Sequence, residues 1–205
     1  YYLPDTNPDQ VLQIFLMNLD GSLFPDGNVV KQLTFTDVGT FNSWPRWSPN
    51  GREIAFHSSA DGDFEIFTVR PDGTGLKQIT DNTVLDQFPA WSPNGRQLAI
   101  RRGNELFIID RDGLNPVQLT TSTGTVINQM ASWSPDGKTL AFLSNRAGYG
   151  SVFLTDPLGE NQVNLTPKPP VIVGNTWSSR APDWSRNGKY IYFTGVRPQT
   201  CNSLG

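Results

Sequence analysis

The chain has one residue set that could support hydrolysis, and it is built around His57. This is the only histidine among 205 residues, with Ser58 and Ser59 directly after it and Asp61 and Asp63 close behind. A hydrolytic triad needs a nucleophile, a base and an orienting carboxylate that meet in space, whereas these residues share one expected strand and hairpin. No Gly-x-Ser-x-Gly turn occurs in the chain. We therefore expect His57 to be packed between sheets, and we expect no catalytic residues and no enzyme activity.

Two stretches could bind a metal through oxygen atoms. Asp5-x-Asn7-x-Asp9 and Asp61-x-Asp63-x-Glu65 alternate oxygen-bearing side chains, as calcium loops do. Neither continues into a twelve-residue loop with a bidentate glutamate, and Asp is also an ordinary residue of hairpin turns. We predict no metal and no cofactor, with calcium as the weaker alternative. A single cysteine, Cys201, excludes a disulfide within the chain, and with His57 as the only histidine it argues against a zinc site of Cys and His ligands.

Charge and hydropathy exclude several classes of partner. The net charge is −3, from 16 basic and 19 acidic residues, which leaves no basic footprint for nucleic acid. No apolar run approaches the ~20 residues of a membrane helix, and the opening Tyr-Tyr-Leu-Pro-Asp does not resemble a signal peptide. We expect neither nucleic-acid binding nor membrane insertion.

The elements that position these residues follow from a repeated motif. Trp-Ser-Pro-Asn-Gly begins at Trp47 and Trp91, Trp-Ser-Pro-Asp-Gly at Trp133, and Trp-Ser-Arg-Asn-Gly at Trp184, so the tryptophans are 44, 42 and 51 residues apart. A period of ~40–45 residues is typical of a four-stranded propeller blade. Between the turns lie short apolar strands and Gly-rich hairpins, without a sustained 3.6-residue pattern. We expect almost no helix.

The predicted fold class is all-β, a β-propeller of four-stranded antiparallel blades. Three blades are complete, at 47–80, 91–120 and 133–166, and two are partial, at 1–34 and 184–205. Tyr1-Tyr2-Leu3 aligns with the second strand of a blade, so this strand would occur twice if the two ends formed one blade. The interpretation that we favour is an arc of a larger propeller. A four-bladed ring sealed by its two ends is the alternative if Tyr1-Tyr2 is not a strand.

The repeat resembles the TolB-like β-propeller repeat family. The motifs that carry the resemblance are Pro45-Arg46-Trp47-Ser48-Pro49-Asn50-Gly51, Ile54-Ala55-Phe56, Asp72-Gly73 and Ile79-Thr80, and their copies cover essentially the whole chain. The resemblance implies a propeller and a partner-binding protein of the cell envelope. Similar repeats also occur in secreted proteins and in propellers that gate serine peptidases. Arg101-Arg102 and Arg186 depart from the pattern, which weakens single turns.

The repeat tryptophans Trp47, Trp91, Trp133 and Trp184 are expected to wedge between blades, because their spacing follows the repeat. Binding is expected instead from the segments that join one blade to the next, 35–46, 81–90, 121–132 and 167–183. Such loops gather on one face of a propeller and carry function on a rigid scaffold. The channel-rim candidates are Trp44, Arg46, Phe88, Met130, Trp177, Arg180 and Asp183. The alternative is that Trp44, Phe88 and Met130 only pack the inner rim.

Three functions remain open from the sequence. The leading hypothesis is a non-enzymatic module that binds a protein partner or self-associates, in the periplasm, at the cell surface or in the exterior. The second is a structural subunit of a surface layer or filament. The third is a propeller that gates a hydrolase domain absent from this chain. Location rests on the family resemblance.

Overall fold

The fold is all-β. The computed structural model describes residues 11–148, 150–167 and 181–194, and these contain strands and turns but no helix. The strands are β1 (Phe15–Met17), β2 (Val30–Gln32), β3 (Asn42–Trp47), β4 (Ile54–Ser58), β5 (Glu65–Val69), β6 (Lys77–Gln78), β7 (Asp86–Trp91), β8 (Gln97–Arg102), β9 (Glu105–Asp110), β10 (Val117–Gln118), β11 (Asn128–Trp133), β12 (Leu140–Ser144), β13 (Ser151–Thr155), β14 (Val163–Asn164), β15 (Asp183–Trp184) and β16 (Ile191–Tyr192).

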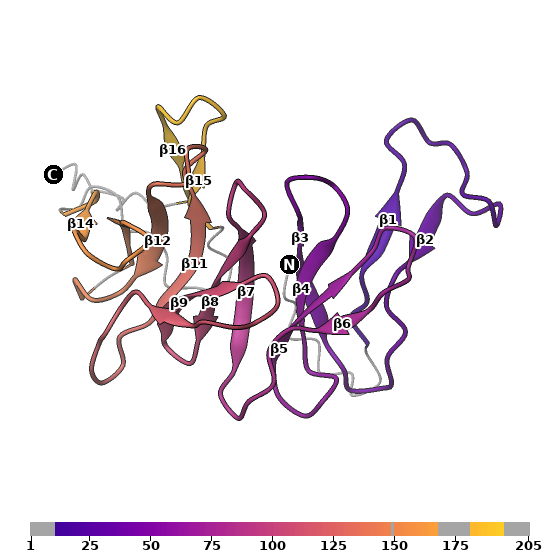
Figure 1. Cartoon of the computed structure of the whole chain (residues 1–205), viewed down its shortest axis with the longest axis horizontal. Helices are drawn as coiled ribbons and strands as arrows, with labels where there is room; N and C mark the ends of the chain where they lie inside the picture. Colours follow the sequence, from indigo (N-terminus) through magenta and orange to yellow (C-terminus); the bar gives the residue numbers. More distant parts are fainter. Residues whose placement is uncertain (1–10, 149, 168–180, 195–205) are drawn as a thin grey trace, which may run out of the picture.

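The strands form five separate antiparallel sheets, which confirms the predicted fold class. Three sheets have four strands in the meander order β3-β4-β5-β6, β7-β8-β9-β10 and β11-β12-β13-β14. The two end sheets, β1-β2 and β15-β16, have two strands each among the described residues and do not pair with one another. Figure 1 shows them on opposite sides of β3 and β7. The described residues therefore form an open arc of blades rather than a sealed four-bladed ring.

The Trp-Ser-Pro-Asn-Gly motif folds as a tight turn between the first and second strands of each blade. In the first copy the Ser48 hydroxyl accepts the Glu53 N–H (2.9 Å) and donates to Asn50 Oδ1 (2.9 Å). Gly51 has φ of 68°, a conformation that glycine adopts without steric cost. Equivalent serine bonds recur in the other copies. The motif is thus accounted for by turn chemistry.

The threonine that closes each repeat joins the fourth strand to the third. Thr80 Oγ1 accepts the Ile66 N–H at 2.8 Å, and Thr120 Oγ1 accepts the Leu106 N–H at 2.9 Å. The same bond recurs at Thr34 and Thr166. A buried backbone N–H needs an acceptor, so the hydroxyl stabilises the edge of the blade.

Tryptophans seal successive blades together. Trp91 Nε1 donates to the Arg46 carbonyl (3.2 Å), Trp133 Nε1 to the Ala90 carbonyl (3.2 Å) and Trp184 Nε1 to the Ser132 carbonyl (3.3 Å). Each acceptor directly precedes the tryptophan of the previous blade. Trp91 and Trp133 are each 9% exposed and belong to apolar clusters between blades. Their placement is that of inter-blade wedges.

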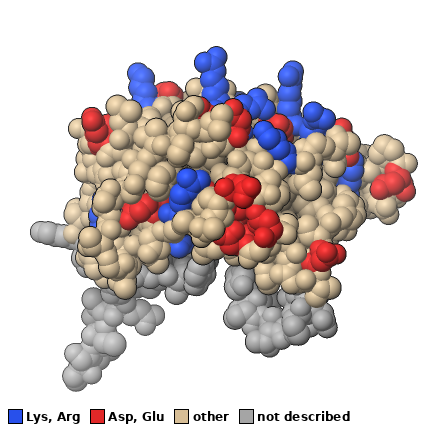
Figure 2. Space-filling view, turned by 60° about the horizontal axis from the view of Figure 1, so that its bottom comes forward, with Lys and Arg blue, Asp and Glu red and all other residues tan. Residues whose placement is uncertain are grey.

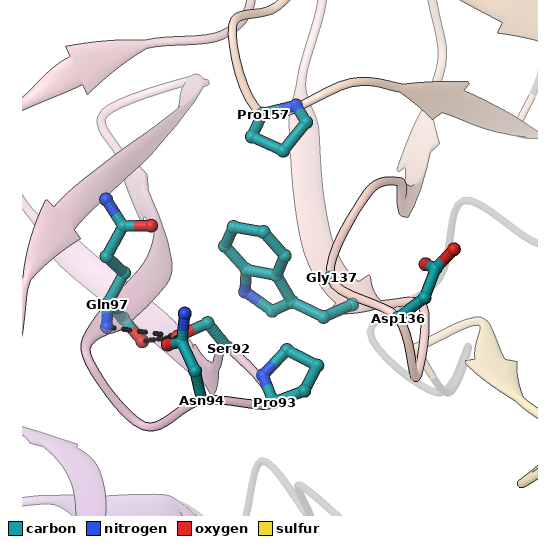
Figure 3. A pocket seen from close by; sticks show the side chains of 8 residues that line it. Ser92, Pro93, Asn94, Gln97, Asp136, Gly137 and Pro157 are labelled. Carbon is teal, nitrogen blue, oxygen red and sulfur yellow. Dashed lines mark hydrogen bonds between the residues drawn. The ribbon is translucent and has the colours of Figure 1, made fainter.

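The turns also stack on one another. A methyl group built on Gly137 would lie 3.7 Å from Pro93 Cδ of the previous turn. Figure 3 shows Pro93 and Gly137 beside a small hollow that Pro157 also lines, with the Ser92 bonds closing the turn below it. Most of the lining consists of motif residues, so the hollow follows from the stacking of the turns.

Candidate binding site at the inner strands

Three candidate residues lie on strands rather than in the loops that the sequence suggested. Trp44 is in β3, Phe88 in β7 and Met130 in β11, so the connecting loops end before these residues and not at Arg46. Each of the three first strands contains a bulge after its second residue, for example between Ser43 and Arg46, and then resumes pairing. The expected loop boundary was wrong because a bulge interrupts the alternation by which a strand is recognised.

The bulge forces an uncommon backbone conformation. Trp44, Phe88 and Met130 have φ of 60°, 55° and 55°, in the left-handed region that costs side-chain-bearing residues roughly 1 kcal/mol. Glycine would remove that cost. A large apolar side chain stands there three times, so the side chain itself must compensate for the strain, by packing or by contact.

Burial in the core compensates for the backbone strain at two of these three residues, Phe88 and Met130. Phe88 and Met130 are 5% and 2% exposed, and they belong to one apolar cluster that continues to Trp184 and Phe193. Trp44 is only half-buried, although it meets Phe88 edge to face with ring centroids 4.9 Å apart. The inner strands therefore carry an apolar row whose Trp44 end remains accessible.

Charged candidates gather at the accessible end of this row. The Arg46 guanidinium lies 5.8 Å from the centre of the Trp44 ring. Asp183 and Tyr192 interact electrostatically with Arg46, although they lie far along the chain. Tyr192 donates its hydroxyl proton to Asp183 Oδ2 at 2.6 Å. The fold thus brings Trp44, Arg46 and Asp183 together, and their role in binding stays a prediction.

Arg46 combines solvent exposure with crowding. The side chain is exposed, yet surrounding protein atoms lower the pKa of its guanidinium while Asp183 and Tyr192 oppose that shift. Arg46 supplies a cation, Trp44 an aromatic ring and Asp183 a carboxylate. Together these groups could bind a polar segment of another protein.

His57 does not form a catalytic pair, despite a short contact with serine. Its Nε2 lies 2.7 Å from Ser43 Oγ, and its Nδ1 accepts the Phe88 N–H at 3.2 Å. Burial lowers the pKa of His57 to about 3, so the ring is neutral. With Nδ1 accepting, the ring proton must sit on Nε2 and be donated to Ser43. His57 then has no free lone pair with which to deprotonate a nucleophile, and it packs against Phe64 and Phe88 as the sequence suggested.

A buried polar clasp between blades was not visible in the sequence. The Glu65 carboxylate accepts the Asn82 N–H at 2.7 Å, and Asn82 Nδ2 bridges Glu65 Oε2 (3.3 Å) and Asp86 Oδ2 (3.1 Å). Arg102 donates two hydrogen bonds to Asp86, at 2.8 and 2.6 Å. Burial raises the pKa of Glu65 to about 7, with Asp86 and Asp63 adding to the effect. Arg102, which departed from the motif, is thus the counter-ion of a buried acid.

The clasp could have been found only by comparing strand registers. Asp86 pairs with Arg102 where the neighbouring blades pair Asn42 with Ser58 and Asn128 with Ser144. An acid and a base have therefore replaced two neutral residues together. The exchange keeps the buried position satisfied, since a buried charge needs a partner.

The remaining candidates fall into two groups. Trp177, Arg180, Asp5, Asn7, Asp9 and Cys201 lie outside the described residues. Within the described ranges, no three His, Cys, Asp or Glu side chains converge as a metal ion would require, and Glu65 points into the clasp rather than toward Asp61. The described part of the chain also contains no helix long and apolar enough to cross a membrane.

Residues 55–149 match the family described as the "Dipeptidyl peptidase IV (DPP IV) N-terminal region". Among curated proteins, the "Tol-Pal system protein TolB" of Syntrophus aciditrophicus (strain SB) is 60% identical over 35 residues, which cover 17% of this chain and 8% of that protein. The match thus spans a small part of that relative's length.

Solved structures share the fold. TolB from Acinetobacter baumannii superposes with a TM-score of 0.67 at 22% identity, covering 87% of this chain and 43% of that one. A puromycin hydrolase S511A mutant superposes with a TM-score of 0.62 at 20% identity, covering 80% of this chain and 29% of that one. Both likenesses concern the fold alone. Motif, blade architecture and these similarities together show that the described residues have a TolB-like β-propeller fold.

Proposed function

We propose that this chain is a non-enzymatic protein-binding module that works outside the cytoplasm. The observation that carries the proposal is the half-buried Trp44, held at φ of 60° with Arg46 stacked on it and Asp183 close by. Strain and an accessible aromatic ring are combined at the end of a rigid apolar row. Residues of this kind act as anchors in protein interfaces.

The charge of the surface suits a protein partner. Figure 2 shows basic side chains along one border and near the centre of a face, and acidic side chains at several places with a larger group near the centre, while most of the face is neither acidic nor basic. Such a mixed surface selects a partner by local complementarity rather than by a single-sign field. The extracytoplasmic location rests on the likeness to a Tol-Pal system protein.

Site-specific photo-crosslinking tests the proposal. A benzophenone amino acid would replace Trp44 in one variant and Leu158, which is 69% exposed on a distant turn, in a control variant. Each variant would be incubated with extracytoplasmic extract of the source cells. We expect one protein to be captured through position 44 and not through position 158. Labelling that is equal at both positions would contradict the proposal.

The affinity of each variant for the captured protein measures how much Trp44 contributes to binding. Trp44→Ala should weaken binding by about tenfold or more, because truncating an aromatic anchor costs at least about 1.4 kcal/mol. Leu158→Ala should leave the affinity unchanged. A Trp44→Ala variant that is folded and binds as tightly as wild type would exclude this surface.

A second candidate is a propeller that gates an attached hydrolase. The match to the dipeptidyl peptidase IV N-terminal region favours it, because that region belongs to a peptidase. The reading frame that contains this chain would then also encode a hydrolase domain. Its absence from the full-length protein would exclude this candidate.

A further inference from the structure

Arg101 is the departure from the repeat motif that the clasp leaves unexplained. It is only 8% exposed, and it pairs with Gln87 across β7 and β8. The residues at the same register position in the neighbouring blades are His57, whose ring is neutral, and Leu143. A blade therefore needs no charge at this position, and the buried guanidinium of Arg101 requires another explanation.

This buried guanidinium forms no ion pair with a carboxylate of the described residues. Three other arginines each have a carboxylate that acts on the pKa of their guanidinium: Asp183 on Arg46, Asp86 on Arg102 and Glu105 on Arg146. For Arg101, burial alone lowers the pKa. A buried charge is costly unless an opposite charge compensates it, so this position lacks an anion.

Only neutral oxygen atoms hold the Arg101 side chain. Its Nε donates to the Gly103 carbonyl, its Nη1 to Gln129 Oε1 at 3.2 Å and its Nη2 to Asn104 Oδ1 at 3.3 Å. The last two bonds are longer than the ~2.7–2.9 Å that is usual between a charged nitrogen and a carboxylate. They fix the position of the guanidinium without neutralising it.

Unused hydrogen-bond donors surround the guanidinium. A guanidinium has five N–H groups, so two of those on Arg101 remain after the three bonds. The side-chain NH2 groups of Gln129 and Asn104 also donate to no acceptor among the described residues, and each is bonded to the carbon that carries the oxygen facing Arg101. Asn104 is exposed and Gln129 is half-buried, so a ligand can reach these donors from solvent.

We propose that Arg101, Asn104 and Gln129 form a binding site for a carboxylate group. The carboxylate oxygens accept the two free guanidinium N–H groups and the NH2 groups of the two amides. One negative charge matches the single positive charge, whereas a phosphate monoester, at about −1.5 to −2 at pH 7, would leave excess negative charge in a buried place. The carboxylate comes from a small acid or from an acidic side chain of another protein. The site uses no residue of the Trp44 surface and is independent of the proposed function.

Sodium acetate is the first probe of the full chain, at pH 7.5. The side-chain amide resonances of Asn104 and Gln129 should shift and saturate as acetate is added, and Arg101→Leu should weaken the binding by about tenfold or more. Leucine occupies this register position in the next blade, so the variant should fold. Arg96→Leu, at an exposed arginine of the same blade, is the matched control and should bind acetate as wild type does.

A blocked peptide, acetyl-Gly-Asp-Gly-amide, separates the two sources of the carboxylate. Its aspartate is its only charged group. Binding at least about tenfold tighter than that of acetate would support an acidic protein segment as the ligand. Affinities equal to that of acetate would support a small carboxylic acid.

Four results would overturn the proposal. One is the absence of saturable binding of either probe to wild type. The second is an equal response of wild type and Arg101→Leu. The third is inorganic phosphate that binds more tightly than acetate. The fourth concerns Asp5 and Asp9, the acidic residues outside the described ranges: acetate binding by Asp5→Asn/Asp9→Asn but not by wild type would mean that the chain fills the site itself.

Discussion

The same substitution at two equivalent tryptophans should have very different costs. A buried tryptophan removes roughly 150–250 Å² from water, which corresponds to about 4–6 kcal/mol at about 25 cal/mol per Å². Trp133 is 9% exposed and also donates a hydrogen bond to the Ala90 carbonyl, whereas Trp47 is 50% exposed and its indole N–H has no bond to a carbonyl among the described residues. We expect Trp133→Ala to lower the free energy of unfolding by about 4–5 kcal/mol and Trp47→Ala by about 2 kcal/mol.

Urea unfolding of the dilute protein, followed by far-ultraviolet circular dichroism, measures both costs. Should Trp133→Ala fail to fold, Trp133→Phe and Trp47→Phe give a milder comparison, in which only the first leaves a buried carbonyl without its donor and costs about 1 kcal/mol. Equal destabilisation at the two positions would refute the reasoning, because it would mean that the tryptophan does not act as a wedge between blades.

The remaining predictions concern pH and the closing threonine. Burial raises the pKa of Glu65 from 4.5 to about 7, so the folded state retains a proton that the unfolded chain releases, and the free energy of unfolding should fall as the pH rises through that window. Burial lowers the pKa of His57 from 6.5 to about 3, so its contribution is lost as the pH falls below 6.5. In Glu65→Gln only the His57 effect remains, so the free energy of unfolding should rise from pH 4.5 to 6.5. If urea titrations of wild type and Glu65→Gln give the same dependence of this free energy on pH, the assignment to Glu65 is wrong. Thr120→Val should lower the free energy of unfolding by about 1–3 kcal/mol, because it leaves the buried Leu106 N–H without an acceptor. The control is Thr121→Val, at the exposed neighbouring residue. Equal melting temperatures of the two variants would show that the Thr120 hydrogen bond does not stabilise the blade.

Local chemistry made the blades predictable from the sequence. The Trp-Ser-Pro-Asn-Gly turn is held by bonds among residues five or fewer apart, such as Ser48 with Asn50 and Glu53. Strands that follow such turns pair with their immediate neighbours, so a repeat of about 40 residues implies its sheet. Their period predicted a wedge role for all four repeat tryptophans. Trp91, Trp133 and Trp184 donate to the previous blade, whereas Trp47 is 50% exposed.

The site was predictable only as a list of residues. Arg46 and Asp183 are brought together by the stacking of blades, and the clasp of Glu65 with Asp86 depends on the same stacking. Neither contact can be predicted from the local sequence pattern. The left-handed φ of Trp44 was hidden for another reason, because glycine is the residue that usually marks such a bulge.

Hydrogen exchange of the indole protons, assigned by NMR, tests the central claim most directly. The claim is that one residue type serves shape at the repeat positions and contact at Trp44. The indole protons of Trp91 and Trp133 are buried and bonded to carbonyls, so they should exchange slowly, while that of the half-buried Trp44 should exchange fast. Exchange of Trp91 or Trp133 as fast as that of Trp44 would contradict the account.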